Sequence, residues 1–167
     1  MIRAEAAARQ HGRAIALRLL ERRLRSRVEL AAALRRRGVS AEDVVAVLGS
    51  LRRIGWIDDA RFARAWISDR LALRPSGRRR LRAELLARGV SSVDADEALT
   101  ALLPAGREQA AVLEQARGRL RHLKGVPRPV ARRRLAAWLQ RRGFASETIV
   151  RVLRTVDVNG EEGDLPA

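Results

Sequence analysis

The sequence predicts an all-α protein built from three tandem three-helix, helix-turn-helix-like repeats that stack end to end. Three observations support this prediction. Of the 167 residues, 47 % are apolar, mostly Leu, Ala and Val, and only 3 % are aromatic, a composition that favours helices over strands. A short amphipathic motif that ends in glycine occurs three times. The residues that follow each glycine also repeat at fixed offsets, as expected for stacked copies of one helical unit.

The repeated motif is an amphipathic helix that ends at Gly38, Gly89 or Gly143. These glycines are separated by 51 and 54 residues. Leucine stands eight and four positions before each glycine: Leu30 and Leu34, Leu81 and Leu85, Leu135 and Leu139. Leucines four residues apart share one helical face, so we expect all six to be buried. An arginine precedes each glycine (Arg37, Arg88, Arg142), where a cation favours the helix dipole and glycine accepts the left-handed conformation.

A second helix follows each glycine. Its apolar residues fall six, nine and ten positions after the glycine: Val44, Val47 and Leu48; Ala95, Ala98 and Leu99; Ile149, Val152 and Leu153. In the first two copies, Ser40 with Asp43 and Ser91 with Asp94 have the spacing of an N-cap and an acidic third residue. The third copy has Ala145 at the position of the cap, so we expect Ser146 to cap one residue late.

The spacing between glycines requires one more helix before each pair. The candidates are Ala14–Arg25, Asp59–Ala72 and Arg107–Lys124, and Pro- and Gly-containing segments at 75–77 and 125–127 end the last two. The expected organisation is a flexible N-terminus (1–12), three repeats (13–54, 55–103 and 104–156) and a disordered acidic tail (157–167). The tail would either screen the basic surface or simply promote solubility.

The net charge of +16, from 35 basic and 19 acidic residues, predicts a polyanionic partner. Lys124 is the only lysine, which indicates the codon bias of a GC-rich genome, but that bias does not explain the excess of base over acid. The chain has no cysteine, which excludes disulfides and thiolate chemistry. It has neither a signal-like apolar segment near the N-terminus nor the roughly 18–20 apolar residues that span a bilayer. We therefore expect a cytoplasmic protein that does not contact membranes.

Residues for catalysis are missing from the sequence. His11 and His122 have no ligand or triad partner at a recognisable spacing, and neither glycine-rich nucleotide-binding motif occurs. The adjacent carboxylates of Asp58 and Asp59 come nearest to a catalytic pair. They precede the helix that carries Phe62, however, so we interpret them as residues that cap this helix and favour its positive end. The sequence thus predicts a binding protein without enzymatic activity, cofactor or metal.

Arginine runs open the middle helices of the second and third copies. Arg79 and Arg80 point away from the face of Leu81, Arg78 and Arg82 flank that face, and Arg133 and Arg134 repeat the pattern. The predicted contact residues for a partner or nucleic acid are Arg35, Arg36, Arg78, Arg79, Arg80, Arg82, Arg132, Arg133 and Arg134. An ordinary solvated helix face is the alternative explanation.

A three-helix unit of this kind is also typical of helix-turn-helix transcription regulators. The last helices of the first two copies, however, begin with acidic residues such as Glu42, Asp43 and Asp94 and carry almost no base-reading side chains. Sequence-specific DNA reading is therefore the second hypothesis rather than the first.

Four segments resemble the RecX family of bacterial regulators of the RecA recombinase. The most specific is Gly55-Trp-Ile-Asp-Asp-Ala-Arg-Phe-Ala63, which is similar to that family's Gly–aromatic–aliphatic–Asp-Asp–x–x–Phe-Ala signature, with Trp56 where tyrosine is commoner. The other matching segments are 16–38, 77–90 and 141–153, so the resemblance covers roughly Ala14 to Leu153.

This resemblance implies an extended, curved molecule of three three-helix repeats. It implies a protein that binds the RecA–DNA filament, lies in its groove and limits filament growth, ATP hydrolysis, strand exchange and co-protease activity in DNA repair and the SOS response. It also implies binding to single- and double-stranded DNA, which we expect to be non-specific and directed to phosphates. We expect a monomer, with Trp56, Phe62 and Trp66 in the core.

Overall fold

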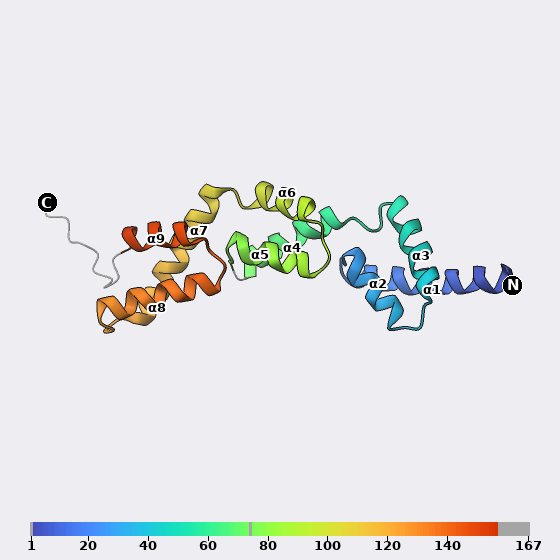
Figure 1. The fold of residues 1–167 in the computed structure, drawn as a ribbon, viewed down its shortest axis with the longest axis horizontal. Helices are drawn as coiled ribbons and strands as arrows, with labels where there is room; N and C mark the ends of the chain where they lie inside the picture. Colours follow the sequence, from blue (N-terminus) through green and yellow to red (C-terminus); the bar gives the residue numbers. More distant parts are fainter. Residues whose placement is uncertain (1, 74, 157–167) are drawn as a thin grey trace. The chain divides into compact units, whose positions relative to one another are not determined.

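The computed structural model describes residues 2–73 and 75–156, and all regular structure in this part of the chain is helical (Figure 1). The elements are α1 (Ile2–Arg22), α2 (Arg27–Arg35), α3 (Ala41–Arg53), α4 (Asp59–Leu73), α5 (Arg78–Ala87), α6 (Ser92–Leu102), α7 (Ala105–Leu120), the short 3-10 helix η1 (Arg121–Leu123), α8 (Arg128–Arg141) and α9 (Ser146–Thr155). Each repeat, which contains Gly38, Gly89 or Gly143, has three α-helices, so the predicted fold class is confirmed.

The chain divides by its packing into two compact units. The first contains residues 1–66 and 84–98, and the second contains residues 67–83 and 99–167. Residues 67–83, from α4 to α5, thus belong to the second unit, although sequence places them in the middle copy. Each unit is described by itself below.

In the first unit, α1, α2 and α3 pack together around one core. Leu30, Leu34 and Leu51 are fully buried there, and α1 contributes Ala16 and Leu19. In the second unit, α7, α8 and α9 enclose an equivalent core, in which Leu135, Leu139 and Phe144 are buried. The leucine pair before the glycine therefore has the same role in both cores.

The middle copy follows the same pattern of burial. Leu81 and Leu85 have no exposed surface, and neither do Ala95 and Leu99 in α6. The leucines eight and four positions before Gly38, Gly89 and Gly143, and the apolar residues six, nine and ten positions after them, are at most 7 % exposed. The sequence periodicity thus identified the core-facing residues of all three copies correctly.

The predicted helix ends are confirmed in the first two copies. Ser40 accepts a hydrogen bond from the Asp43 amide at 3.1 Å, and Ser91 accepts one from the Asp94 amide at 3.0 Å. Gly38, Gly89 and Gly143, which follow the middle helices, have φ near +80°. In the third copy the prediction was wrong: Ser146 is the first residue of α9, and Ala145 occupies the cap position without a side-chain bond. A residue already inside the helix has helical backbone angles and cannot serve as its N-cap.

The N-terminus also differs from the expectation of a flexible segment at residues 1–12. It is helical from Ile2, and α1 ends at Arg22 rather than Arg25. The segment contains four alanines and two arginines besides Glu5 and Gln10, and all of these are strong helix formers. Tertiary contacts add to this propensity, because Arg9 pairs with Glu42 and Asp43 of α3 at 3.3 and 3.2 Å. The predicted disordered tail, residues 157–167, lies outside the described residues.

Within the first unit, the start of α2 is fixed to residues of the next copy; we call this contact the first joint. Fully buried Ser26 donates its hydroxyl to the Arg88 carbonyl at 2.6 Å and accepts the Glu29 amide at 3.1 Å. Asp59 accepts the Arg27 amide at 2.7 Å. Two backbone donors in the first turn of α2, which have no partner within the helix, and the carbonyl of the residue after α5 are thereby satisfied.

Within the second unit, the start of α5 makes the corresponding contact, the second joint. The Gly77 amide donates to the Arg142 carbonyl at 2.9 Å, and Glu108 accepts the Arg78 amide at 2.9 Å. The Arg142 side chain returns to donate to the Pro75 carbonyl at 3.1 Å. The two joints use equivalent positions of the repeat, because Gly77 lies 51 residues after Ser26 and Arg142 lies 54 residues after Arg88.

Candidate partner interface

The arginines that the sequence predicted to face outward do so. Arg79 in α5 and Arg133 and Arg134 in α8 are exposed, whereas Leu81 and Leu135, on the opposite faces of the same helices, are fully buried. Arg80 is exposed too, but it makes contacts within the protein, and its backbone lies directly against Gly143. The second unit thus presents guanidinium groups from two middle helices.

The flanking arginines are more constrained. Arg78 is half-buried and donates to the Thr100 hydroxyl at 2.9 Å. Arg82 is half-buried and also makes contacts within the protein. Arg132 is exposed and reaches the Leu153 carbonyl at 3.3 Å. These three side chains therefore contribute to packing as well as to positive charge.

Arg35 and Arg36, at the end of α2, are exposed and belong to the first unit, whereas the other seven predicted contact residues belong to the second. Their position at the helix C-terminus is electrostatically favourable, because a cation there meets the negative end of the helix dipole. The first copy presents less positive charge along its middle helix than the other two, since Val28 and Glu29 stand where Arg79 and Arg80 stand in the second copy.

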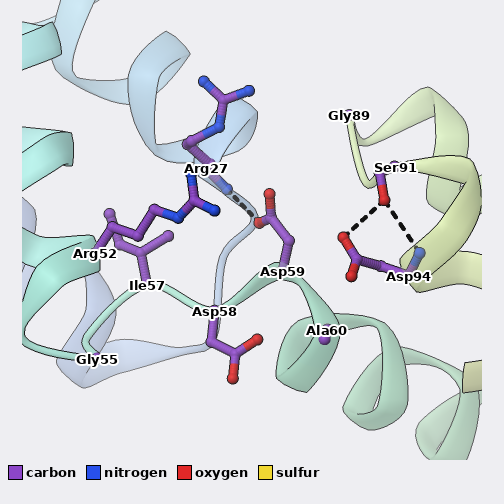
Figure 2. Close-up of a pocket in the computed structure, with 10 residues that line it drawn as sticks. All are labelled: Arg27, Arg52, Gly55, Ile57, Asp58, Asp59, Ala60, Gly89, Ser91 and Asp94. Atoms are coloured by element: carbon purple, nitrogen blue, oxygen red, sulfur yellow. Dashed lines mark hydrogen bonds between the residues drawn. The ribbon is translucent and has the colours of Figure 1, made fainter.

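Five residues of the Gly55–Ala63 signature help to line a cleft of about 500 Å³ in the first unit (Figure 2). The side chains around it carry both charges. The residues are Arg27, Arg52, Gly55, Ile57, Asp58, Asp59, Ala60, Gly89, Ser91 and Asp94. Figure 2 shows that the Asp59 carboxylate points toward Arg27, that Asp58 points away from Asp59, and that Ser91 binds Asp94.

Each carboxylate in this cleft has a structural partner. Asp58 accepts the Arg61 amide at 2.9 Å and so caps α4, as predicted. Asp59 accepts the Arg27 amide, and Asp94 accepts the Ser91 hydroxyl at 2.7 Å. Within the described ranges, no three His, Asp or Glu residues are grouped so that they could hold a metal ion. The three carboxylates thus stabilise the starts of α4 and α6 and the first joint.

The aromatic residues do not all lie where we expected. Phe62 is buried, and the half-buried Trp66 stacks on it at 6.1 Å between ring centroids. The prediction that Trp56 is a core residue was wrong, because 43 % of it is exposed. Gly55 ends α3 with φ +74°, and the Trp56 amide then binds the Leu51 carbonyl at 2.9 Å. This turn directs the next residue, Ile57, into the core and leaves Trp56 at the surface.

Sequence comparison identifies all three repeats. The chain matches the first, second and third three-helix domains of RecX over residues 13–51, 58–99 and 107–153. The chain belongs to the RecX family. It is 42 % identical over 156 residues to the regulatory protein RecX of Thermobifida fusca, covering 93 % of this chain and 84 % of that protein. It is 39 % identical over 137 residues to RecX of Treponema pallidum, covering 80 % and 84 % of the two chains.

The solved structures agree on the fold. The crystal structure of RecX from Lactobacillus salivarius superposes with a TM-score of 0.83 over 92 % of this chain and 99 % of that one, at 18 % identity. A second RecX crystal structure gives a TM-score of 0.83 at 21 % identity, over 92 % of this chain and 74 % of that one.

By its sequence matches, the protein is a RecX-family regulator of RecA, a non-enzymatic class, as the motifs predicted. No helix in the described part of the chain is long and apolar enough to cross a membrane.

Proposed function

We propose that this RecX-family protein binds the RecA–DNA filament stoichiometrically and limits filament growth and ATP hydrolysis through its basic surface. The observation that supports this interface is the outward exposure of Arg79, Arg133 and Arg134 opposite fully buried leucines. Repeats that each add contacts to one filament act at high effective concentration, so modest individual contacts combine into tight binding. For the repeat boundaries we propose 13–54, 55–103 and 104–156.

The contact set that we propose contains the nine arginines at the middle helices: Arg35, Arg36, Arg78, Arg79, Arg80, Arg82, Arg132, Arg133 and Arg134. Arg79, Arg133 and Arg134 are the best residues to test. Their side chains are exposed and make no hydrogen bond or ion pair within the described residues. Arg80 is less suitable, because changing it would also disturb contacts within the protein.

The test is inhibition of the DNA-dependent ATPase of RecA by the triple variant R79E/R133E/R134E. We expect the concentration for half-inhibition to rise at least about tenfold, equivalent to ~1.4 kcal/mol of binding free energy. The matched control, R13E/R18E/R154E, reverses three exposed arginines outside the proposed set. Equal inhibition by both variants, with the helical circular dichroism of the wild type retained, would refute the interface.

We further propose that the protein binds single- and double-stranded DNA as a monomer, through phosphates and without sequence preference. Such contacts release counterions from the DNA, so the affinity falls as salt rises. If the protein neutralises about six phosphates, raising the salt from 50 to 200 mM should lower its affinity roughly 10³-fold. A preferred duplex sequence in random-site selection would instead support a helix-turn-helix transcription regulator. The acidic residues in the first turns of α3 and α6, Glu42, Asp43 and Asp94, argue against that alternative, because carboxylates there would repel phosphate.

A further inference from the structure

A second cavity, of about 410 Å³, lies in the first unit beside the first joint, and its charged lining is mostly basic. Four guanidinium groups and one carboxylate line it, those of Arg23, Arg25, Arg36, Arg88 and Glu29. Arg23 and Arg25 come from the segment between α1 and α2, Arg36 follows α2, and Arg88 follows α5. Positive charges thus converge on one cavity from three separate places in the sequence.

The single carboxylate does not neutralise all of these arginines. Glu29 lies 3.0 Å from an Arg23 nitrogen and 3.5 Å from the Arg88 Nε atom. Arg88 is further occupied by the Trp66 ring, whose centroid lies 3.7 Å from the guanidinium carbon. Arg25 and Arg36 have no ion pair within residues 2–73 and 75–156. The excess positive charge of the cavity lining is therefore carried mainly by Arg25 and Arg36.

Arg25 also has an unused donor. Its Nε atom is buried and has no hydrogen-bond acceptor among the described residues. Partial burial lowers the pKa of the Arg25 guanidinium below its usual value, and the positive charge of Arg23 lowers that pKa further. A bound anion would satisfy the donor and relieve the repulsion, because hydrogen bonds between guanidinium and an oxyanion are among the stronger ones in proteins.

We propose that this cavity binds a backbone phosphate of nucleic acid, a role that rests on the DNA binding proposed above. Guanidinium groups that approach from several directions match the tetrahedral oxygens of a phosphate, and Arg is well suited to such recognition. Val28, Ala32 and Ala87 supply an apolar wall against which a sugar can pack. A volume of about 410 Å³ lies within the range of small-ligand sites.

The first test compares the binding of a fluorescein-labelled oligothymidylate by two double variants. R25Q/R36Q removes the two arginines that lack carboxylate partners, and R18Q/R22Q removes two exposed arginines of α1 that do not line the cavity. We expect R25Q/R36Q to lower the affinity about tenfold and to reduce the salt slope by ~0.7, the value for one phosphate of a single strand. We expect the control variant to keep the wild-type slope.

The outcomes separate this inference from the proposed function. If R25Q/R36Q binds like R18Q/R22Q while the wild type binds tightly, the phosphate site is refuted and the general DNA binding stands. If the wild type does not bind the oligonucleotide, both proposals fail. If R25Q/R36Q keeps the affinity of its control for DNA but loses inhibition of RecA, these two arginines contact RecA rather than a phosphate, which also refutes the phosphate site.

A second measurement does not depend on overall affinity. The side-chain Nε–H NMR signal of Arg25, assigned by its absence from R25Q, should shift when oligothymidylate is added, because the donor gains an acceptor. The corresponding signal of Arg18 on α1 should remain unchanged. An Arg25 signal that stays in place at saturating oligonucleotide would overturn the proposal even if the variants bind weakly for another reason.

Discussion

The two joints have the same design but use different chemical groups. In the first, the Ser26 hydroxyl donates to the Arg88 carbonyl; in the second, the Gly77 amide donates to the Arg142 carbonyl at the equivalent position. A side chain makes the first contact and the backbone makes the second.

The acidic partners of the two joints follow the same rule. Asp59, at the first residue of α4, accepts the first amide of α2, and Glu108, in the first turn of α7, accepts the first amide of α5. Each carboxylate therefore stands near the start of one helix and also meets the positive end of another. Equivalent backbone geometry can thus be maintained while the residues that maintain it change.

Space is the second difference. A Cβ atom on Gly77 would overlap the backbone of Gly143 and Phe144, whereas a Cβ atom on Gly89 would overlap the side chain of Val28. Gly77 stands at the position where the first joint has Ser26, so the second joint has no room for a side chain where the first joint holds one. A substitution at Gly77 is therefore expected to cost more than one at Ser26. The predictions below test this ranking.

The largest effect is expected for Gly77→Ala. The added methyl group would separate α5 from the turn after α8 and break the bond from the Gly77 amide to the Arg142 carbonyl, at a cost of about 3 kcal/mol in unfolding free energy. Urea unfolding followed by tryptophan fluorescence measures this cost. The control is Gly106→Ala in α7, where a new Cβ meets nothing within 4 Å and should stabilise by roughly 0.5 kcal/mol.

An intermediate effect is expected for Ser26→Ala in the first joint. This change removes the cap of α2 and leaves the Arg88 carbonyl without its buried donor, so we expect a loss of about 2 kcal/mol. Ser40→Ala removes an exposed cap of α3 and should cost only about 1 kcal/mol in the same urea experiment. Equal losses for the two variants would show that the bond to Arg88 adds nothing to stability.

The smallest effects are expected for the carboxylates. Asp59→Asn and Glu108→Gln keep an acceptor for the Arg27 and Arg78 amides but remove the charge, so each should cost about 0.5 kcal/mol. Thermal unfolding at low and high salt measures the stability of each variant relative to the wild type. The loss of stability should shrink at high salt, because salt screens the charge. A cost several times larger at one joint only would show that the two carboxylates are not equivalent.

Much of the fold, and the exposure of three of the arginines proposed as contacts, could be predicted from short-range patterns. Leucine spacing identified the buried faces, and the arginines at 79, 133 and 134 followed as the opposite faces of the same helices. The predictions failed where distant residues decide. Arg9 holds the N-terminal helix against α3, and the turn at Gly55 places Trp56 outside although its neighbour Ile57 is inside.

The sequence by itself determined the class of fold, the three-copy organisation, the buried positions of the repeated motif and the family. Helical geometry repeats every few residues, so a local pattern is enough to show which side of a helix is apolar. Only the tertiary structure decided that Ser26 meets Arg88, that Gly77 meets Arg142, and that Arg23, Arg25, Arg36 and Arg88 surround one cavity. These contacts join residues far apart in the chain, and their positions depend on how whole helices pack, which no local spacing records.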